Sequence, residues 1–238
     1  FYRFSLGHPN SRVILQNQDD LAFFRQCDLL RPGQAALIRG SGVDLSLYTP
    51  CEEPAEKPVR VTMVSRFLSD KGIREFAEAA RILKARGIQV ICTLVGYVDD
   101  GNRAAVAQEE IDGWVAEGIV ENWGRRDDMN EVYKHSHIAC LPSYREGLPK
   151  SLLEAGACGR PIITTDVPGC REVVEPGKNG LLVPVKNAAA LADAIEKLVS
   201  DKALRLAMGK YARKKTEAEF TVDAVVASTF ALYNELNH

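Results

Sequence analysis

From residue 59 onward, the hydrophobic positions follow two alternating periods. Short apolar runs rich in β-branched residues predict strands at 59–65, 90–95, 119–123, 138–142, 161–165 and 180–183. Between these runs the apolar residues recur every three or four positions, as in Ile73, Phe76, Ala80 and Leu83. This spacing predicts helices at about 71–86, 104–117, 129–136, 150–158, 187–198, 202–220 and 222–236.

Strands that alternate with helices indicate βαβ units, whose strands are parallel. Right-handed crossovers then place helices on both faces of the sheet. The pattern therefore predicts an α/β fold, a Rossmann-like parallel sheet with helices on both faces.

The first 50 residues show a different pattern. They predict a strand at 13–16, a helix at 19–27 and a strand at 36–39. Residues 49–58 follow, with three prolines and three glutamates, a composition typical of a linker. We therefore expect three parts: residues 1–50, a layered domain at 51–220, and a last helix at 221–238. The chain opens Phe1-Tyr2-Arg3-Phe4 without an initiator Met, which suggests a piece of a longer protein.

The composition narrows the function classes. The 238 residues are 46% hydrophobic and 26% charged, with a net charge of −2, which excludes intrinsic disorder. No global positive charge favours nucleic acid, and no apolar run approaches the ~18 residues that would cross a bilayer. The six cysteines form no CxxC pair, so we expect reduced, mostly buried thiols without a metal, and a cytoplasmic location.

Candidate chemistry gathers where the predicted strands end. In an open parallel sheet, ligands bind outside the carboxyl ends of the strands. Arg66 and Lys71 follow the first strand of the layered domain, and Gly124 and Arg125 follow the third. The fourth is followed by Ser-Tyr-Arg-Glu-Gly-Leu-Pro at 143–149. Glycines, cations and carboxylates on one rim suit a phosphorylated, polyhydroxyl ligand.

The residue types suggest how such a ligand would be held. Arg66 and Lys71 can neutralise a diphosphate. Gly147 and Leu148 precede Pro149 at the start of a helix, where free N–H groups and the helix dipole attract an anion. The plainer interpretations, two solvated surface cations and an ordinary strand-to-helix turn, remain open.

Two carboxylates accompany these groups. Glu146 lies in the turn and Glu154 eight residues further on, inside the predicted helix. A carboxylate can accept two hydrogen bonds from a vicinal diol, so the pair could hold two different sugars. A pair of surface glutamates would have the same spacing.

Several better-known sites are missing from the sequence. There is no Walker P-loop, no HExxH and no Gly-x-Ser-x-Gly elbow. Gly40-Ser-Gly-Val-Asp44 lacks the third glycine of a dinucleotide fingerprint, which makes hydride transfer a distant alternative. No Asp-x-Asp that would bind a metal diphosphate is present among the acidic pairs.

The sequence resembles the retaining glycosyltransferases of the GT-B fold, family four (group 1). The resemblance is carried by Ser65-Arg-Phe67 with Asp70-Lys-Gly72, and by 142–154, which contains the family's Glu-x7-Glu motif with Glu146 and Glu154 at its ends. Weaker matches extend it over residues 36–185. The residues within these motifs are most similar to those of the subgroup that builds capsule, O-antigen and lipid-linked glycans.

The resemblance implies a role for each residue. Arg66 and Lys71 would bind the donor diphosphate and stabilise the leaving nucleotide, while Glu146 would contact the transferred sugar. Glu154 would bind the ribose diol, Gly147 and Leu148 would support sugar and phosphate, and Gly124 and Arg125 would flank the base. By resemblance to the subgroup, the donor would be a nucleotide sugar, UDP-linked rather than GDP-linked, with no metal and no other cofactor.

The resemblance also implies what lies outside this chain. Residues 1–50 would be the remnant of the family's N-terminal acceptor domain with the crossover linker, and the rest of that domain would be missing. The chain would thus be a donor-binding half, inactive by itself, whose last helix packs on the N-terminal domain. The acceptor would be a glycan or a polyprenyl-linked sugar, with peripheral membrane contact of the whole protein at the inner face of the membrane. The alternatives are a sugar-nucleotide-binding module and a GT-B-like epimerase, which would need catalytic acids that this chain does not supply.

Overall fold

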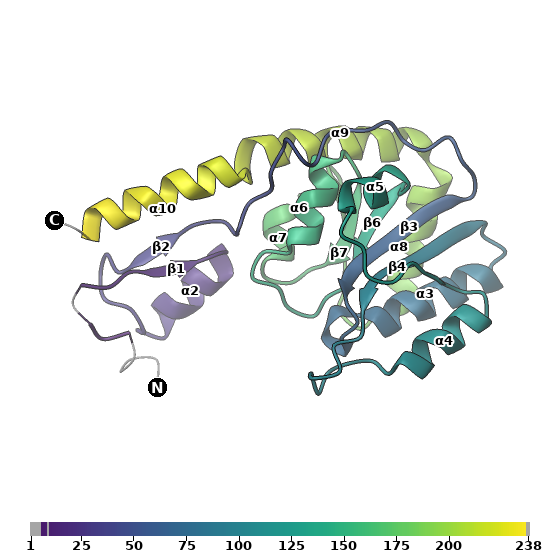
Figure 1. Ribbon diagram of the computed structural model, residues 1–238, viewed down its shortest axis with the longest axis horizontal. Coiled ribbons are helices and arrows are strands. Elements are labelled where there is room, and N and C mark those ends of the chain that lie inside the picture. The colour runs from purple at the N-terminus through teal and green to yellow at the C-terminus, as the bar shows by residue number, and fades with distance from the viewer. Residues whose placement is uncertain (1–5, 9, 237–238) are drawn as a thin grey trace.

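Residues 6–8 and 10–236 are described by a computed structural model (Figure 1). The chain's opening at 1–5 and its last two residues lie outside this description. The main unit is a six-stranded parallel sheet in the order β5-β4-β3-β6-β7-β8. Its strands are β3 (Val59–Arg66), β4 (Val90–Tyr97), β5 (Glu121–Asn122), β6 (Ile138–Leu141), β7 (Ile162–Thr165) and β8 (Gly180–Val183).

Helices cover both faces of this sheet, as the sequence predicted. The chain moves from β3 outward to β5 and then from β6 outward to β8, so right-handed crossovers put the connecting helices on opposite faces. α3 packs on α8, and α6 packs on α9. The helices are α3 (Ile73–Ala85), α4 (Gln108–Ala116), α5 (Met129–Lys134), α6 (Lys150–Ala157), α7 (Cys170–Val173), α8 (Ala188–Ser200), α9 (Lys202–Glu219) and α10 (Val222–Leu236), with a 3-10 turn η1 (Ser69–Lys71) before α3.

Most predicted boundaries agree with these elements. Asn187 caps α8 through its side chain, which accepts a hydrogen bond from the Ala190 N–H (2.9 Å), and Gly159 follows the end of α6 at φ +73°. Three predictions were wrong in detail. The helix predicted from 104 begins at Gln108, the strand at 119–123 is reduced to Glu121–Asn122, and α7 was missed because four residues carry no readable period.

A second, smaller unit precedes the sheet. β1 (Val13–Leu15) and β2 (Ala35–Leu37) pair in parallel, and α2 (Gln18–Gln26) connects them. α10 runs alongside this unit (Figure 1), where Asn10 Nδ2 donates to the carbonyl of Leu236 (3.3 Å). The segment after β2 crosses the junction of α9 and α10, and Val43 exchanges backbone hydrogen bonds with Phe220 and Val222. The small unit and α10 therefore lie at the same end of the molecule.

The core lies between the large sheet and its helices. Val61 and Met63 of β3 and Ile138 of β6 are fully buried, as are Phe76 and Leu83 of α3. Within the described residues, no helix is both long and apolar enough to cross a membrane. The cysteines are free: four are buried, Cys51 is half-buried and Cys27 is exposed.

Candidate functional site

The strand order places a topological switch point at the carboxyl ends of β3 and β6. The chain leaves β3 toward one edge of the sheet and leaves β6 toward the other, so these adjacent strands form the point where the direction reverses. Ligands of open α/β sheets bind at such points. Lys71 follows β3 and Glu146 follows β6, so both residues lie at the switch point.

Lys71 and Glu146 meet at the switch point. Lys71 Nζ donates to Glu146 Oε1 at 2.6 Å, and the side chains are 19% and 12% exposed. The contact depends on a close approach of two loops, because Ser143 Oγ and the Tyr144 N–H both donate to the carbonyl of Asp70 (3.1 and 2.8 Å). The cation and the carboxylate that the sequence predicted on one rim are thus direct neighbours.

Gly72 makes this approach possible. It has φ +76°, and a Cβ at this position would lie 2.1 Å from the carbonyl oxygen of Pro142. Only a glycine permits both the left-handed conformation and the contact with backbone. Lys71 is therefore held beside the loop that follows β6.

Arg66 and Arg125 lie on the neighbouring part of the rim. Arg66 Nη1 donates to Asp99 Oδ2 at 2.8 Å and its side chain is 48% exposed. Arg125 lies over the ring of Tyr97 (5.5 Å to the centroid), and the carbonyl of Gly124 accepts from the Gly96 N–H (2.9 Å). These residues form a second group at the ends of β3, β4 and β5, separate from the Lys71–Glu146 pair but on the same edge of the sheet.

Gly147 and Leu148 lead into α6 at the switch point. Their N–H groups donate to no backbone acceptor within the part of the chain that the structure describes. Together with the N-terminus of α6, they can bind an anion. Gly169, at φ +79°, packs beneath them, since a Cβ there would lie 2.5 Å from the carbonyl oxygens of Glu146 and Gly147.

The small N-terminal unit packs against this loop, which the sequence did not predict. Asn17, fully buried, donates through Nδ2 to the carbonyl of Gly147 (2.9 Å). Glu172 accepts from the Gln18 N–H (2.8 Å) and pairs with Arg39 (2.9 Å). The loop at 146–148 is therefore held from both units.

Glu154 lies inside α6 and has a partner that the sequence analysis missed. Its Oε1 accepts a hydrogen bond from the hydroxyl of Tyr48 (2.8 Å), and Lys150 Nζ lies 3.6 Å away. Burial raises the pKa of this carboxyl above its usual value, and the bond from Tyr48 opposes that shift. Tyr48 could have attracted notice as an aromatic residue beside a proline- and glutamate-rich linker.

Two further residues on the rim also escaped prediction. Lys186 follows β8 and lies over the ring of Tyr144 (5.0 Å). The Tyr144 hydroxyl donates to Glu75 Oε1 (2.6 Å), and burial with this carboxylate raises the tyrosine pKa to about 12. The hydroxyl of Tyr144 thus stays protonated. The neutral ring gives the rim an aromatic face, which the Lys186 ammonium contacts.

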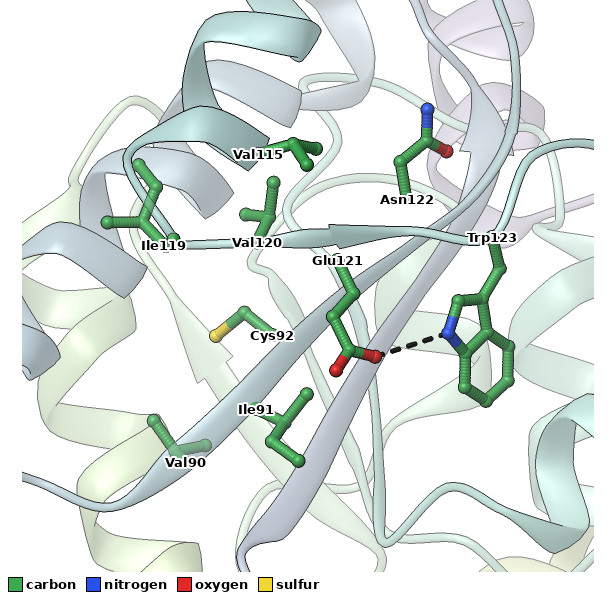
Figure 2. A pocket seen from close by; sticks show the side chains of 10 residues that line it. Val90, Ile91, Cys92, Val115, Ile119, Val120, Glu121, Asn122 and Trp123 are labelled. Atoms are coloured by element: carbon green, nitrogen blue, oxygen red, sulfur yellow. Dashed lines mark hydrogen bonds between the residues drawn. The ribbon is translucent and has the colours of Figure 1, made fainter.

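A cavity of about 590 Å³ lies elsewhere and contains none of the candidate residues. It opens beside β5 and the first residues of β4 (Figure 2), where Trp123 Nε1 donates to Glu121 Oε2 (3.2 Å). Apolar side chains, including Val90 and Val120, line most of it. Val90 and Cys92 lie at the beginning of β4, whereas Lys71 and Glu146 follow the ends of β3 and β6, so this cavity is distinct from the Lys71–Glu146 site.

Comparison with known proteins gives a consistent picture. The family model for glycosyl transferases group 1 matches residues 50–215. A Campylobacter jejuni N,N'-diacetylbacillosaminyl-diphospho-undecaprenol α-1,3-N-acetylgalactosaminyltransferase is 33% identical over 214 residues, covering 84% of this chain and 54% of that protein. The Staphylococcus aureus capsular polysaccharide glycosyltransferase CapM is 28% identical, covering 72% and 44%.

Solved structures agree in fold. Sucrose-phosphate synthase from Thermosynechococcus elongatus superposes with a TM-score of 0.82 at 32% identity, covering 94% of this chain and 58% of that one. Anabaena HepE, solved in complex with UDP, gives 0.83 at 23% identity, covering 97% and 67%, and shares the fold.

The chain spans about half the length of the curated relatives it matches. The matched region contains both ends of the Glu-x7-Glu motif, Arg66 at the end of β3 and Lys71 after it. The resemblance inferred from the motifs is thereby confirmed: this chain belongs to the glycosyl transferases group 1 family.

Proposed function

We propose that this chain is the donor-binding part of a retaining glycosyltransferase that uses a nucleotide sugar and needs no metal. The observation that carries the proposal is the Lys71–Glu146 contact at the switch point, beside the N–H groups of Gly147 and Leu148. A diphosphate bound there would take Lys71 as its cation, and Glu146 would then accept hydrogen bonds from sugar hydroxyls.

The same groups would stabilise the departing nucleotide. Negative charge develops on the leaving phosphate during glycosyl transfer, and Lys71, Arg66 and the start of α6 are positioned on the rim where it would form. We propose that the acceptor attacks from the face that the phosphate leaves, and that the phosphate takes the acceptor's proton. No carboxylate of this chain is assigned as a covalent nucleophile.

Glu154 and the group at Gly124 and Arg125 would bind the nucleoside. The buried carboxylate would accept the ribose diol, and Arg125 with Tyr97 offers a flat surface for a base. UDP is the first nucleotide to test, because it occupies a protein of the same fold.

The acceptor is proposed from the relatives. The Campylobacter protein's name states a polyprenyl-diphosphate-linked sugar as acceptor, and CapM is named for capsule synthesis. We propose a glycan or lipid-linked acceptor, held by a further domain and reached at the cytoplasmic face of a membrane.

Calorimetric titration with UDP, GDP and several UDP-sugars tests the donor site directly. We expect one nucleotide to bind equally well with EDTA and with Mg²⁺. Glu146→Gln should bind UDP as well as the parent chain does but lose its preference for the UDP-sugar. Absence of binding by every nucleotide, or binding that Mg²⁺ alone restores, would contradict the proposal.

A further inference from the structure

Two cysteines far apart in the sequence meet at the C-terminal end of α6. Cys51 lies in the linker after the small unit, and Cys158 caps the C-terminal end of α6, 107 residues away. The N–H and the Sγ of Cys51 lie 3.5 and 3.6 Å from the carbonyl oxygen of Cys158, and the Cys158 Sγ donates to Asn130 Oδ1 (3.5 Å). The Cys51 sulfur therefore lies against the residue that carries the second thiol.

A buried guanidinium accompanies this pair without an acidic partner. Arg160 is 2% exposed and donates through Nη2 to the carbonyls of Cys51 (3.1 Å) and Glu52 (2.8 Å), and to the Cys51 sulfur. No carboxylate in the described chain forms an ion pair with it, and its Nε has no hydrogen-bond partner. Since a buried charge requires compensation, the Cys51 thiolate is the anion available to it.

The two thiols differ in acidity. The hydrogen bond from Cys158, together with the charges of Arg160 and Lys134, lowers the pKa of Cys51 to about 6 against the opposing effect of burial. The bond to Cys51 and burial raise the pKa of Cys158. Cys51 is thus the nucleophile of the pair and Cys158 its protonated partner.

The other buried cysteines have no such environment. Burial raises the pKa of Cys92 to about 12 and that of Cys170 to about 11, and it raises the pKa of Cys140 as well, so all three remain protonated. Cys51, in contrast, is only half-buried and lines a cavity of about 260 Å³ between the linker and α9. This cavity is the route by which a small oxidant would approach Cys51.

We propose that Cys51 and Cys158 form a reversible oxidation site that reacts with a hydroperoxide and closes a disulfide. The Cys51 thiolate attacks a peroxide oxygen, the O–O bond breaks, and Cys51 becomes a sulfenic acid as hydroxide leaves. The Cys158 sulfur then attacks the Cys51 sulfur, and the sulfenic oxygen leaves as water with the Cys158 proton. Two thiols are oxidised and hydrogen peroxide is reduced to two waters.

The disulfide would fasten the linker to α6. Tyr48, three residues before Cys51, is hydrogen-bonded to Glu154 of the same helix. The covalent link would therefore fix the segment that joins the two units of the molecule. This proposal does not depend on the function proposed above.

Thiol counting after oxidation tests the site. The reduced chain is treated with stoichiometric hydrogen peroxide, alkylated with N-ethylmaleimide in denaturant so that the buried thiols also react, and analysed by intact mass and peptide mapping. We expect four of the six thiols to remain alkylatable, the two lost being joined in one Cys51–Cys158 peptide, and dithiothreitol to restore all six. Unaltered alkylation of Cys51 and Cys158, or a disulfide formed through exposed Cys27, would overturn the proposal.

Variants separate the two roles. Cys158→Ser should stop at a Cys51 sulfenic acid that dimedone traps, and Cys51→Ser should lose both the disulfide and the dimedone adduct. Cys27→Ser is the matched control and should form the Cys51–Cys158 disulfide as the parent does. A dimedone adduct that persists in Cys51→Ser would contradict the assignment of Cys51 as nucleophile. Should a variant fold poorly, peptide mapping of the oxidised parent chain still tests whether the disulfide forms.

Discussion

Two glutamates of one sequence motif occupy contrasting regions of this molecule. Glu146 lies in a loop at the edge of the sheet and is balanced by Lys71 at 2.6 Å. Glu154, eight residues later, is buried in α6 against the neutral hydroxyl of Tyr48, with Lys150 at 3.6 Å. The first carboxylate has a cationic partner that an anionic ligand could take, whereas the second carboxylate is part of the interior.

The contrast shows how one motif can serve two purposes. A loop residue with a cationic partner can change partners when an anion enters, because the entering anion attracts the same cation. A buried carboxylate keeps its geometry, but its charge is costly, so its pKa rises. The loop therefore supplies adjustable charge, and the helix supplies a fixed acceptor.

The largest expected effect comes from breaking the approach that forms the first region. In Gly72→Ala, the new Cβ meets the carbonyl of Pro142 at a left-handed residue, which should lower the free energy of unfolding by about 3 kcal/mol. Urea denaturation would measure this loss. Gly87→Ala is the control: at φ +72° with no atom within 4 Å, it should lose only about 1 kcal/mol. Equal losses would show that the contact with Pro142 is unimportant.

Removing the cation tests the loop region alone. Lys71→Met should weaken UDP binding by about 10- to 100-fold, since a hydrogen bond to a charged group contributes about 1.5–3 kcal/mol. Calorimetry would measure the affinity. Lys84→Met, which removes a lysine that contacts the Glu117 carbonyl on the far side of α3, should bind UDP like the parent. An unchanged affinity in Lys71→Met would exclude this lysine from the site.

Neutralising the buried carboxylate sharpens the comparison. Glu154→Gln should weaken UDP binding by about tenfold, because a charged acceptor is replaced by a neutral one. It should also change the dependence of stability on pH. The folded chain holds the Glu154 proton to higher pH than the unfolded chain does, so this group lowers the free energy of unfolding as pH rises above 4.5 through its folded pKa.

Glu154→Gln therefore lacks the fall in unfolding free energy that the Glu154 carboxyl causes as pH rises. Urea denaturation between pH 4.5 and 7 should give a smaller fall in stability for Glu154→Gln than for the parent chain. Glu175 contributes stability that is lost as pH falls, because Lys178 and Lys215 lower its pKa to about 2. Most of that loss occurs below pH 4.5, so Glu175→Gln should change the pH 4.5–7 interval only slightly. Identical profiles for Glu154→Gln and the parent would contradict the buried environment.

The smallest effect concerns the hydrogen bond itself. Tyr48→Phe removes the donor to Glu154 and should cost about 1 kcal/mol of unfolding free energy, with a further rise in the pKa of Glu154. Equilibrium denaturation would detect it. Tyr233→Phe, at an exposed position on α10, should be neutral. A loss of the same size in both variants would show that the Tyr48 bond is not the cause.

Much of the fold could be predicted from local patterns. The apolar runs of β3, β4, β6, β7 and β8 and the helical stripe of α3 match the structure closely, as do the caps at Asn187 and Gly159. The failures are short elements. β5 keeps only two paired residues and α7 has four, and neither length carries enough periodicity to be recognised.

The candidate residues were predictable as a set, but their grouping was not. Sequence placed Arg66, Lys71 and Glu146 after strands, and hence on one rim. The sequence pattern did not indicate that Lys71 forms its ion pair with Glu146, or that Arg66 forms one with Asp99. That outcome depends on β3 lying between β4 and β6, an order that no local pattern records.

The amino-acid sequence by itself determined the parallel α/β architecture, the rim that carries the charged residues, and the family to which the chain belongs. Only the tertiary structure decided that Tyr48 reaches Glu154, that Asn17 holds the carbonyl of Gly147, and that Cys51 meets Cys158. Hydrophobic periodicity arises from neighbours within about two turns or one strand, so it specifies elements. Contacts more than 100 residues apart depend on strand order and loop packing, which are decided when the elements assemble.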